Sequence, residues 1–231
     1  MNLAEWLVRT ARRSPNTPAL LSGKNFVADY TGFARRVANL ASALQARLGI
    51  RPGDRVAIVM SNSVEYLELL YATWFAGAAV VPINFKLHAK EAAWIIENAE
   101  AKAVFVSESA AAELTPLIER LPGLAAVLAV ERKEFSALRT SEPMSAPVSR
   151  RRDDLAWLFY TSGTTGKPKG VMISNGNLHA MAFSYFVDVD EVRTTDATVY
   201  AAPMSHGAGL YNFMHVMRGA RHVSMKPCER R

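Results

Sequence analysis

Residues 53–84, GDRVAIVMSNSVEYLELLYATWFAGAAVVPIN, contain the pattern of a strand, a helix and a second strand in close succession. The near-continuous apolar run Val56 to Met60 is typical of a strand that is buried on both faces. Ser63 is placed to cap the following helix, and Gly77 is placed to end it. A strand over Ala79 to Val81 comes next, so this stretch predicts a βαβ unit.

The same alternation continues on both sides of this unit. Upstream, the first twelve residues read as an amphipathic helix, and Thr31 is placed to cap a second helix with apolar residues at spacings of three and four. Downstream, the predicted elements are a helix over Ala89–Ala99, a strand over Ala103–Val106, a helix over Ala110–Arg120 capped by Ser109, and a strand over Ala125–Val130. This order predicts an α/β fold with doubly wound sheets flanked by helices.

A stretch rich in Ser, Pro, Arg and Glu, from about 131 to 154, interrupts the pattern, and we expect a linker without regular elements there. Order returns at Leu155 to Tyr160, LAWLFY, which predicts another strand.

The composition is that of an ordinary globular protein, with 50% hydrophobic and 21% charged residues among 231. The single cysteine, Cys228, cannot form an internal disulfide, which predicts a reducing compartment and a cytoplasmic location. The charge-free apolar run Leu69 to Phe85 is shorter than the roughly 20 residues of a membrane span and is interrupted by Gly77 and Pro82. We therefore expect no integral membrane segment.

The net charge of +6 suits acidic small molecules such as nucleotides. It would also suit nucleic acid, but the basic residues are scattered and no aromatic-basic platform for RNA or DNA is present. The densest basic run, Arg150 to Arg152, is followed at once by Asp153 and Asp154. We expect no nucleic-acid partner.

A second stretch, YTSGTTGKPKG from Tyr160 to Gly170, concentrates glycines, hydroxyl side chains and lysines between two predicted strands. It is not a Walker-type loop, because Thr161 stands where that pattern needs glycine and Pro168 follows Lys167. Its glycines allow backbone N–H groups to converge, and its hydroxyls and lysines suit a phosphate group. The alternative is a Gly/Thr hairpin that binds no ligand.

The segment YTSGTTGKPKGV resembles the phosphate-binding signature of the adenylate-forming superfamily, which includes acyl-CoA synthetases, nonribosomal-peptide adenylation domains and beetle luciferase. APMSHGAG, residues 202–209, is similar to a second element of that superfamily, and residues 53–84 agree with it as well. The resemblance implies that residues 1–231 are a partial AMP-binding domain, the N-terminal part of the large domain of an AMP-forming acyl-CoA synthetase (fatty-acid–CoA ligase). It implies a truncated chain without the C-terminal lid domain, in which the first residues and those after about Ser184 share one sheet.

The resemblance also assigns roles to residues by their position in the motifs. The implied ATP-binding residues are Thr161, Ser162, Gly163, Thr164, Thr165, Gly166 and Lys169. Thr161 is also the implied neighbour of Mg²⁺, and Lys167 is expected to face solvent. The implied catalytic residues are Lys169 and His206, and the implied substrate pocket consists of His206, Gly207, Gly209 and Tyr211. The alternative for His206 is a satisfied core histidine. We interpret His88, His179, His215 and His222 as structural.

The activity implied is the ATP- and Mg²⁺-dependent conversion of a carboxylic acid, preferably a fatty acid, through an acyl-adenylate to a thioester of coenzyme A. Two alternatives remain open: an adenylation domain that loads a carrier-protein thiol, and a non-catalytic nucleotide-binding remnant. The family stretches that hold adenine and ribose, Tyr-Gly-x-Thr-Glu and Thr-Gly-Asp, do not appear in these residues. We therefore expect the 231-residue chain to be inactive by itself and to self-associate as a homo-oligomer.

Overall fold

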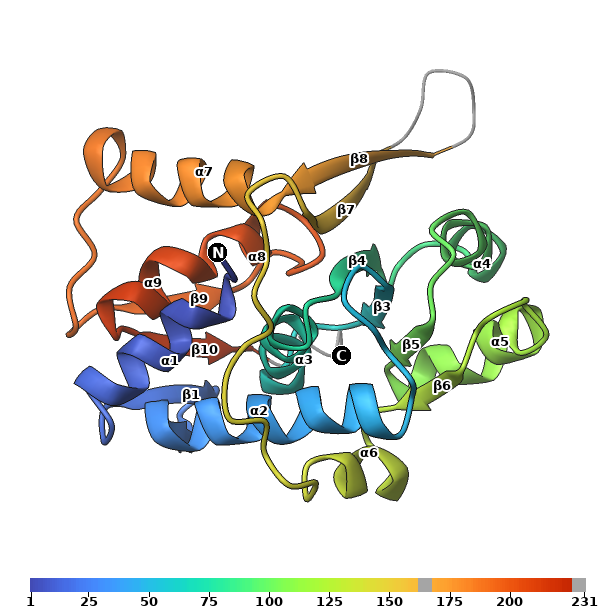
Figure 1. The fold of residues 1–231 in the computed structure, drawn as a ribbon, viewed down its shortest axis with the longest axis horizontal. Helices are drawn as coiled ribbons and strands as arrows, with labels where there is room; N and C mark the ends of the chain where they lie inside the picture. The colour runs from blue at the N-terminus through green and yellow to red at the C-terminus, as the bar shows by residue number, and fades with distance from the viewer. Residues whose placement is uncertain (162–167, 226–231) are drawn as a thin grey trace, which may run out of the picture.

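The computed structural model describes residues 1–161 and 168–225 of the chain. It has two sheets, and helices cover both faces of the larger one (Figure 1). The helices are α1 (Ala4–Arg13), α2 (Tyr30–Ala46), α3 (Val64–Phe75), α4 (Ala89–Asn98), α5 (Glu108–Ile118), α6 (Lys133–Leu138), α7 (Asn175–Asp188), α8 (Gly207–Leu210) and α9 (Asn212–Arg218). The predicted α/β class is confirmed.

The larger sheet has six strands in the order β6-β5-β3-β4-β7-β8. Its strands are β3 (Arg55–Met60), β4 (Ala79–Asn84), β5 (Ala103–Val106), β6 (Ala126–Ala129), β7 (Leu155–Thr161) and β8 (Lys169–Ser174). Strand β8 runs antiparallel to β7, whereas the other pairings in this sheet are parallel. The predicted connection of strand to strand around the glycine-rich stretch is therefore an antiparallel hairpin, joined through β7 to the parallel core.

Successive residues of β3 belong to two different cores, because side chains alternate between the faces of a sheet. Ile58 packs in a cluster with Leu70 of α3, and Val59 packs in a cluster with Ile95 of α4 and Leu114 of α5. The two helix layers thus lie on opposite faces of the same sheet (Figure 1). This arrangement confirms the doubly wound topology expected from the sequence.

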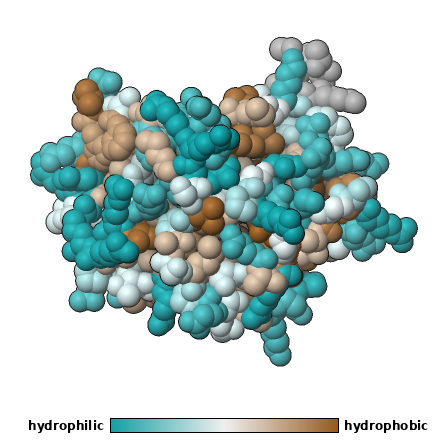
Figure 2. All heavy atoms as spheres, viewed as in Figure 1, coloured by the Kyte–Doolittle hydropathy of each residue, from teal (hydrophilic) through white to brown (hydrophobic). Residues whose placement is uncertain are grey.

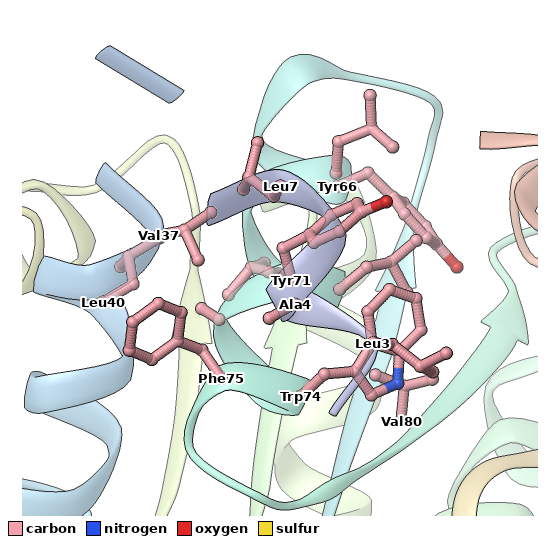
Figure 3. Packing of buried hydrophobic residues seen from close by; sticks show 14 of the residues in the cluster. Leu3, Ala4, Leu7, Val37, Leu40, Tyr66, Tyr71, Trp74, Phe75 and Val80 are labelled. Carbon is pink, nitrogen blue, oxygen red and sulfur yellow. The ribbon is translucent and has the colours of Figure 1, made fainter. Parts of the chain in front are cut away.

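Helix α3 lies at the centre of the larger core, and every residue in it except Glu65 is buried. Figure 3 shows Leu3, directly before α1, and Leu7 of α1 near Tyr71 and Trp74 of α3. Full burial of a large apolar side chain contributes about 2–3 kcal/mol. The apolar residues of α3 therefore belong to the protein core. Among the described helices, none has both the length and the apolar character needed to cross a membrane.

The smaller sheet combines the two ends of the described chain. It has the order β2-β1-β10-β9, with β1 (Pro18–Ser22), β2 (Asn25–Asp29), β9 (Ala197–Tyr200) and β10 (Arg221–Ser224). Strand β10 pairs in parallel with both β1 and β9. This pairing agrees with the shared sheet that the resemblance implied, although the residue pattern did not predict these short strands.

Two predicted helix caps are wrong. The side chain of Asp29, not that of Thr31, accepts a hydrogen bond from the Gly32 amide at 2.7 Å and caps α2. Helix α5 begins at Glu108, so Ser109 lies inside its first turn. The predicted cap at Ser63 is confirmed by its bond from the Tyr66 amide.

The expected linker between β6 and β7 contains a helix, α6, that the sequence analysis did not predict. Its apolar residues, Phe135 and Leu138, are buried, and the ring of Phe135 lies 5.9 Å from that of Phe105 in β5. Two apolar residues three positions apart are too weak a pattern to distinguish one helical turn from a loop. Packing against the core stabilises this turn.

Candidate functional site

A cleft of about 380 Å³ opens at the carboxyl ends of β4 and β7. Residues 82–84 of β4 and 159–161 of β7 form two of its walls, and α4 contributes Glu91 and Ile95. Residues 205–206, which precede α8, and Pro168, which precedes β8, also line the cleft. The carboxyl ends of parallel strands are a common place for ligand sites in α/β proteins.

The glycine-rich stretch begins and ends at the rim of this cleft. Thr161, the last residue of β7, pairs in register with Lys169, the first residue of β8, and both are exposed. Their hydroxyl and ammonium groups therefore belong to the same end of the hairpin, and both suit a phosphate ligand. The other implied phosphate-binding residues, Ser162, Gly163, Thr164, Thr165 and Gly166, lie outside the residues that the structure describes, as does Lys167.

Tyr160 connects the base of this hairpin to α4. Its hydroxyl donates a hydrogen bond to Asn98 Oδ1 at 2.7 Å, and its ring meets the Trp94 ring edge-on. Partial burial raises the pKa of Tyr160 above its usual value, which keeps the hydroxyl in its donating form. A Cβ atom at Gly170, the partner of Tyr160 in β8, would lie 3.0 Å from the Tyr160 ring. Glycine at this position therefore leaves room for the ring.

His206 reaches the cleft from the second motif. Its ring lies edge-on to that of Phe159, with 5.7 Å between the centroids, and its Nδ1 is 3.0 Å from the hydroxyl oxygen of Ser205. The side chain of His206 is exposed and lines the cleft, whereas Ser205 is buried. The alternative that His206 is a satisfied core histidine does not agree with this exposure.

Gly207 and Tyr211 line a second, mostly apolar cavity of about 330 Å³ between α7, α8 and α9. Met181, Leu210 and Met214 supply apolar side chains to its wall. Since His206 lines the cleft and Gly207 lines this cavity, the start of α8 separates the two spaces. Figure 2 shows apolar atoms at the surface over the end of α7, close to this cavity.

Gly209 has a different environment from the other residues of the implied pocket. A Cβ atom there would lie 1.9 Å from the carbonyl oxygen of Met204 and 3.3 Å from the Trp157 ring. Glycine at this position permits a close approach between α8 and the preceding backbone. Gly209 is therefore a packing position, and a larger side chain would collide with the Met204 peptide before it reached a cavity.

The remaining histidines have local partners that account for their positions. His88 accepts a hydrogen bond from the Lys90 amide and caps α4, and His179 donates to the Asn175 carbonyl oxygen. His222 is buried beside Tyr200, whose hydroxyl lies 2.8 Å from its Nδ1, and burial lowers the pKa of His222 to about 3.

Several site residues escaped the sequence analysis. Phe159 was assigned only to a strand, and Ser205 was not singled out, although it precedes His206 directly. Asn62 bonds to the backbone of residues 200–204, which lead to His206. The motif around His206 could have indicated Ser205, but no local pattern points to Asn62.

The described residues fit phosphate better than they fit a metal held by protein alone. Within 1–161 and 168–225, no three His, Cys, Asp or Glu side chains come close enough together to hold an ion. The cleft offers the carboxylate of Glu91 and the hydroxyl of Thr161. Mg²⁺ typically takes one or two protein ligands and completes its coordination with phosphate oxygens and water. The donor set at this cleft is thus compatible with Mg²⁺ that arrives with a nucleotide.

Sequence comparison shows relatives among ligases that form thioesters of coenzyme A. The chain is 38% identical over 210 residues to a feruloyl-CoA synthase of Amycolatopsis, a match that covers 90% of this chain and 40% of that protein. It is 32% identical over 228 residues to the long-chain-fatty-acid–CoA ligase FadD13 of Mycobacterium tuberculosis, covering 95% and 44%. The chain thus spans about two fifths of the length of these curated relatives.

Structural comparison gives the same family. The N-terminal domain of FACL13 from Mycobacterium tuberculosis superposes with a TM-score of 0.87 at 29% identity, covering 97% of this chain and 57% of that one. The family model of the AMP-binding enzymes matches residues 7–231. The match includes the hairpin of Thr161 and Lys169 and the segment of His206, the two motifs that meet at the cleft. This chain therefore belongs to the AMP-binding enzyme family.

Proposed function

We propose that these 231 residues form the amino-terminal part of an enzyme that activates a fatty acid with ATP and transfers the acyl group to coenzyme A. The observation that carries this proposal is the meeting of Thr161 and His206 in one cleft. These residues come from two motifs that are separated along the sequence. A phosphate-binding hairpin beside a second pocket is the arrangement that joining a nucleotide to an acid requires.

In this proposal, Thr161 and Lys169 bind the β- and γ-phosphates of ATP together with residues 162–166. The carboxylate of the acid attacks the α-phosphate, the bond to the β-phosphate breaks, and pyrophosphate leaves. Donors fixed near the departing charge stabilise it, and Lys169 is the proposed cation among them. Thr161 is the proposed neighbour of Mg²⁺, which would supply further positive charge at this end of the cleft. The thiolate of coenzyme A then attacks the acyl carbonyl and releases AMP.

The acid is proposed to bind between Phe159 and His206, with its hydrocarbon tail directed past Gly207 into the second cavity. Met181 and Met214 in the wall of that cavity are flexible and apolar, which suits a chain of methylene groups. The cavity volume of about 330 Å³ and the fact that adjacent residues, His206 and Gly207, line the cleft and this cavity support this placement. A fatty acid is therefore the proposed substrate class.

The test uses the full reading frame that contains these residues, purified and supplied with ATP, Mg²⁺ and coenzyme A. Pyrophosphate release is measured with saturated acids from hexanoate to stearate, with ferulate and with succinylbenzoate. We expect kcat/KM for the preferred fatty acid to exceed that for ferulate by at least about tenfold. A preference for ferulate would overturn the fatty-acid assignment, and the absence of any acid-dependent release would overturn the ligase proposal.

A matched pair of variants tests the placement of the acid. His206→Ala removes a ring from the cleft and is expected to raise the KM for the acid. His215→Ala is the control, because His215 lines neither space. Equal effects of the two substitutions would remove His206 from the proposed pocket.

A further inference from the structure

The structure assigns to Asn62 the role of a positioning residue for the acid-binding side of the cleft. This inference rests on the proposed function and concerns the same cleft. Asn62 follows β3, directly before the cap of α3, and does not line the cleft itself. It acts on the chain segment from Tyr200 to His206, which follows β9.

The side-chain amide of Asn62 makes three hydrogen bonds to this distant segment. Its Nδ2 donates to the carbonyl oxygen of Tyr200 at 2.9 Å and to that of Ala202 at 2.7 Å. Its Oδ1 accepts from the amide of Met204 at 2.8 Å. The partners are three alternate residues of one backbone stretch, so a single side chain fixes the path of five residues.

These bonds satisfy the amide group of Asn62 well. A primary amide has two N–H donors and one carbonyl oxygen, and here both donors and the oxygen have backbone partners. The partners also define the orientation of the amide, since backbone carbonyls accept and a backbone N–H donates. No shorter side chain spans this distance, and Asp at the same position would present acceptors to two carbonyl oxygens.

The held segment leads directly to the residues that line the cleft. The side chain of Met204 is fully buried and packs in the large core, so the segment is anchored by Asn62 on one side and by the core on the other. Ser205 and His206 come next and form one wall of the cleft. The distance between His206 and Phe159 thus depends on where Asn62 places the backbone.

If Asn62 had a purely structural role, its substitution would lower stability without affecting the cleft. Asn2 is a residue for which we expect that result. Its Nδ2 donates to the carbonyl oxygens of Trp74 and Val148, and its Oδ1 accepts from the amide of Ala4. Asn2 therefore also makes three hydrogen bonds, two of which reach distant segments. It lies away from the cleft, so its loss should lower stability without moving His206.

The experiment compares Asn62→Ala, Asn62→Asp and Asn2→Ala in the full reading frame. For both Asn62 variants we expect the KM for the acid to rise by at least about tenfold, while the KM for ATP stays within about twofold. Asn62→Asp preserves the shape of the side chain but removes its N–H donors. A higher KM for the acid in this variant would therefore show that the lost donors cause the change. For Asn2→Ala we expect a lower Tm with an unchanged KM for the acid.

Hydrogen–deuterium exchange of residues 199–207, measured on the 231-residue chain, supplies a readout that needs no catalysis. We expect the Asn62 variants to exchange at least about tenfold faster in this segment, and Asn2→Ala to leave it unchanged. A failed ligase assay would overturn the proposed function, yet the exchange data would still test the contact. Unchanged exchange in Asn62→Ala, or an equal rise in KM for Asn62→Ala and Asn2→Ala, would overturn the role assigned to Asn62.

Discussion

Thr161 and Lys169 face each other at the end of the β7–β8 hairpin, and together they form the described part of the proposed phosphate site. Both side chains are exposed at strand ends, so their positions depend little on packing against neighbouring side chains. The strand pairing determines their separation, whereas the residue types determine the chemistry. Their contributions are therefore open to single substitutions that leave the fold intact.

Lys169→Ala is expected to reduce the rate of ATP–pyrophosphate exchange in the complete enzyme about ten- to a hundredfold. A hydrogen bond to a charged group contributes roughly 1.5–3 kcal/mol, and each 1.4 kcal/mol corresponds to about a factor of ten. Lys167→Ala is the matched control and should change the rate far less. Equal losses in the two variants would show that Lys169 has no special role.

His222 makes the stability of the protein depend on pH. Burial lowers its pKa to about 3, whereas the unfolded chain has the ordinary value of 6.5. Between these values only the unfolded state binds the proton, so the free energy of unfolding falls as the pH falls below 6.5. From pH 7.5 to 5.5 this group alone should cost about 1.4 kcal/mol.

His222→Gln retains a polar partner for Tyr200 but removes the titrating group. Chemical denaturation at several pH values should therefore give a shallower pH dependence for this variant, by about 1.4 kcal/mol across the same range. If the free energy of unfolding depended on pH equally in the variant and the parent protein, His222 would be excluded as the source of the pH dependence.

Helix α8 is a single turn whose two glycines have opposite environments. Nothing lies within 4 Å of a Cβ atom added at Gly207, whereas one at Gly209 meets the Met204 carbonyl oxygen at 1.9 Å. Gly209→Ala should lower the free energy of unfolding by about 1–3 kcal/mol, because the backbone must shift to relieve the overlap. Gly207→Ala should be neutral or slightly stabilising. Thermal denaturation of the two variants checks this, and a tolerated Gly209→Ala would contradict the close packing of α8.

Helix α6 is connected to the core by an ion pair that is partly shielded from water. Arg139, which follows α6, bonds to Glu68 of α3, and Glu68 is fully buried between this guanidinium and that of Arg36. A buried carboxylate that loses a partner keeps its desolvation cost. The Arg139–Glu68 contact thus helps to stabilise α6 against the core, although the sequence of this short helix has only a weak helical pattern.

Arg139→Ala should lower the free energy of unfolding by about 2–3 kcal/mol, because Glu68 then retains one partner. Arg9→Ala is the control, since Arg9 pairs with Glu5 at the exposed surface of α1, where such a pair contributes at most about 0.5 kcal/mol. Urea denaturation measures both. Similar losses in the two variants would mean that the bond to Glu68 adds no more than an exposed pair.

The two sheets meet around one core, and the cleft lies where their connecting segments converge. The larger sheet provides the walls at β4 and β7, and the chain leaving the smaller sheet provides His206. The relatives that share this arrangement are more than twice as long, as the coverage of 40% and 44% shows. The described residues contain the proposed phosphate-binding hairpin and part of the proposed acid pocket, but neither of the two stretches that the resemblance assigned to adenine and ribose.

The 231-residue chain in isolation is accordingly expected not to complete thioester formation. Contacts to remote parts of a substrate orient its reacting atoms, and their loss can reduce rates by several powers of ten. The assay mixes the purified chain with ATP, Mg²⁺, coenzyme A and the same acids, with the full reading frame as a control. Turnover of about 1 per second or more by the short chain would contradict this expectation.

The sequence by itself determined the features that depend on neighbouring residues. The periodicity of apolar residues and turn chemistry predict the βαβ unit of residues 53–84, the strand Leu155–Tyr160 and a second strand after Gly170. The proposal that residues 160–170 bind phosphate follows from their residue types. These features were predictable because hydrogen bonds within a helix or a hairpin, and the freedom of glycine, act between residues close in the sequence.

Only the tertiary structure decided the features that depend on distant contacts. The smaller sheet pairs Leu20 with His222, and Asn62 bonds to Tyr200 and Met204, with well over a hundred residues between the partners in each case. Such bonds leave no periodic pattern in either segment, and α6 likewise depends on the core against which it packs. The cleft itself belongs to this class, because a strand end and a later loop form a site only when the fold brings them together.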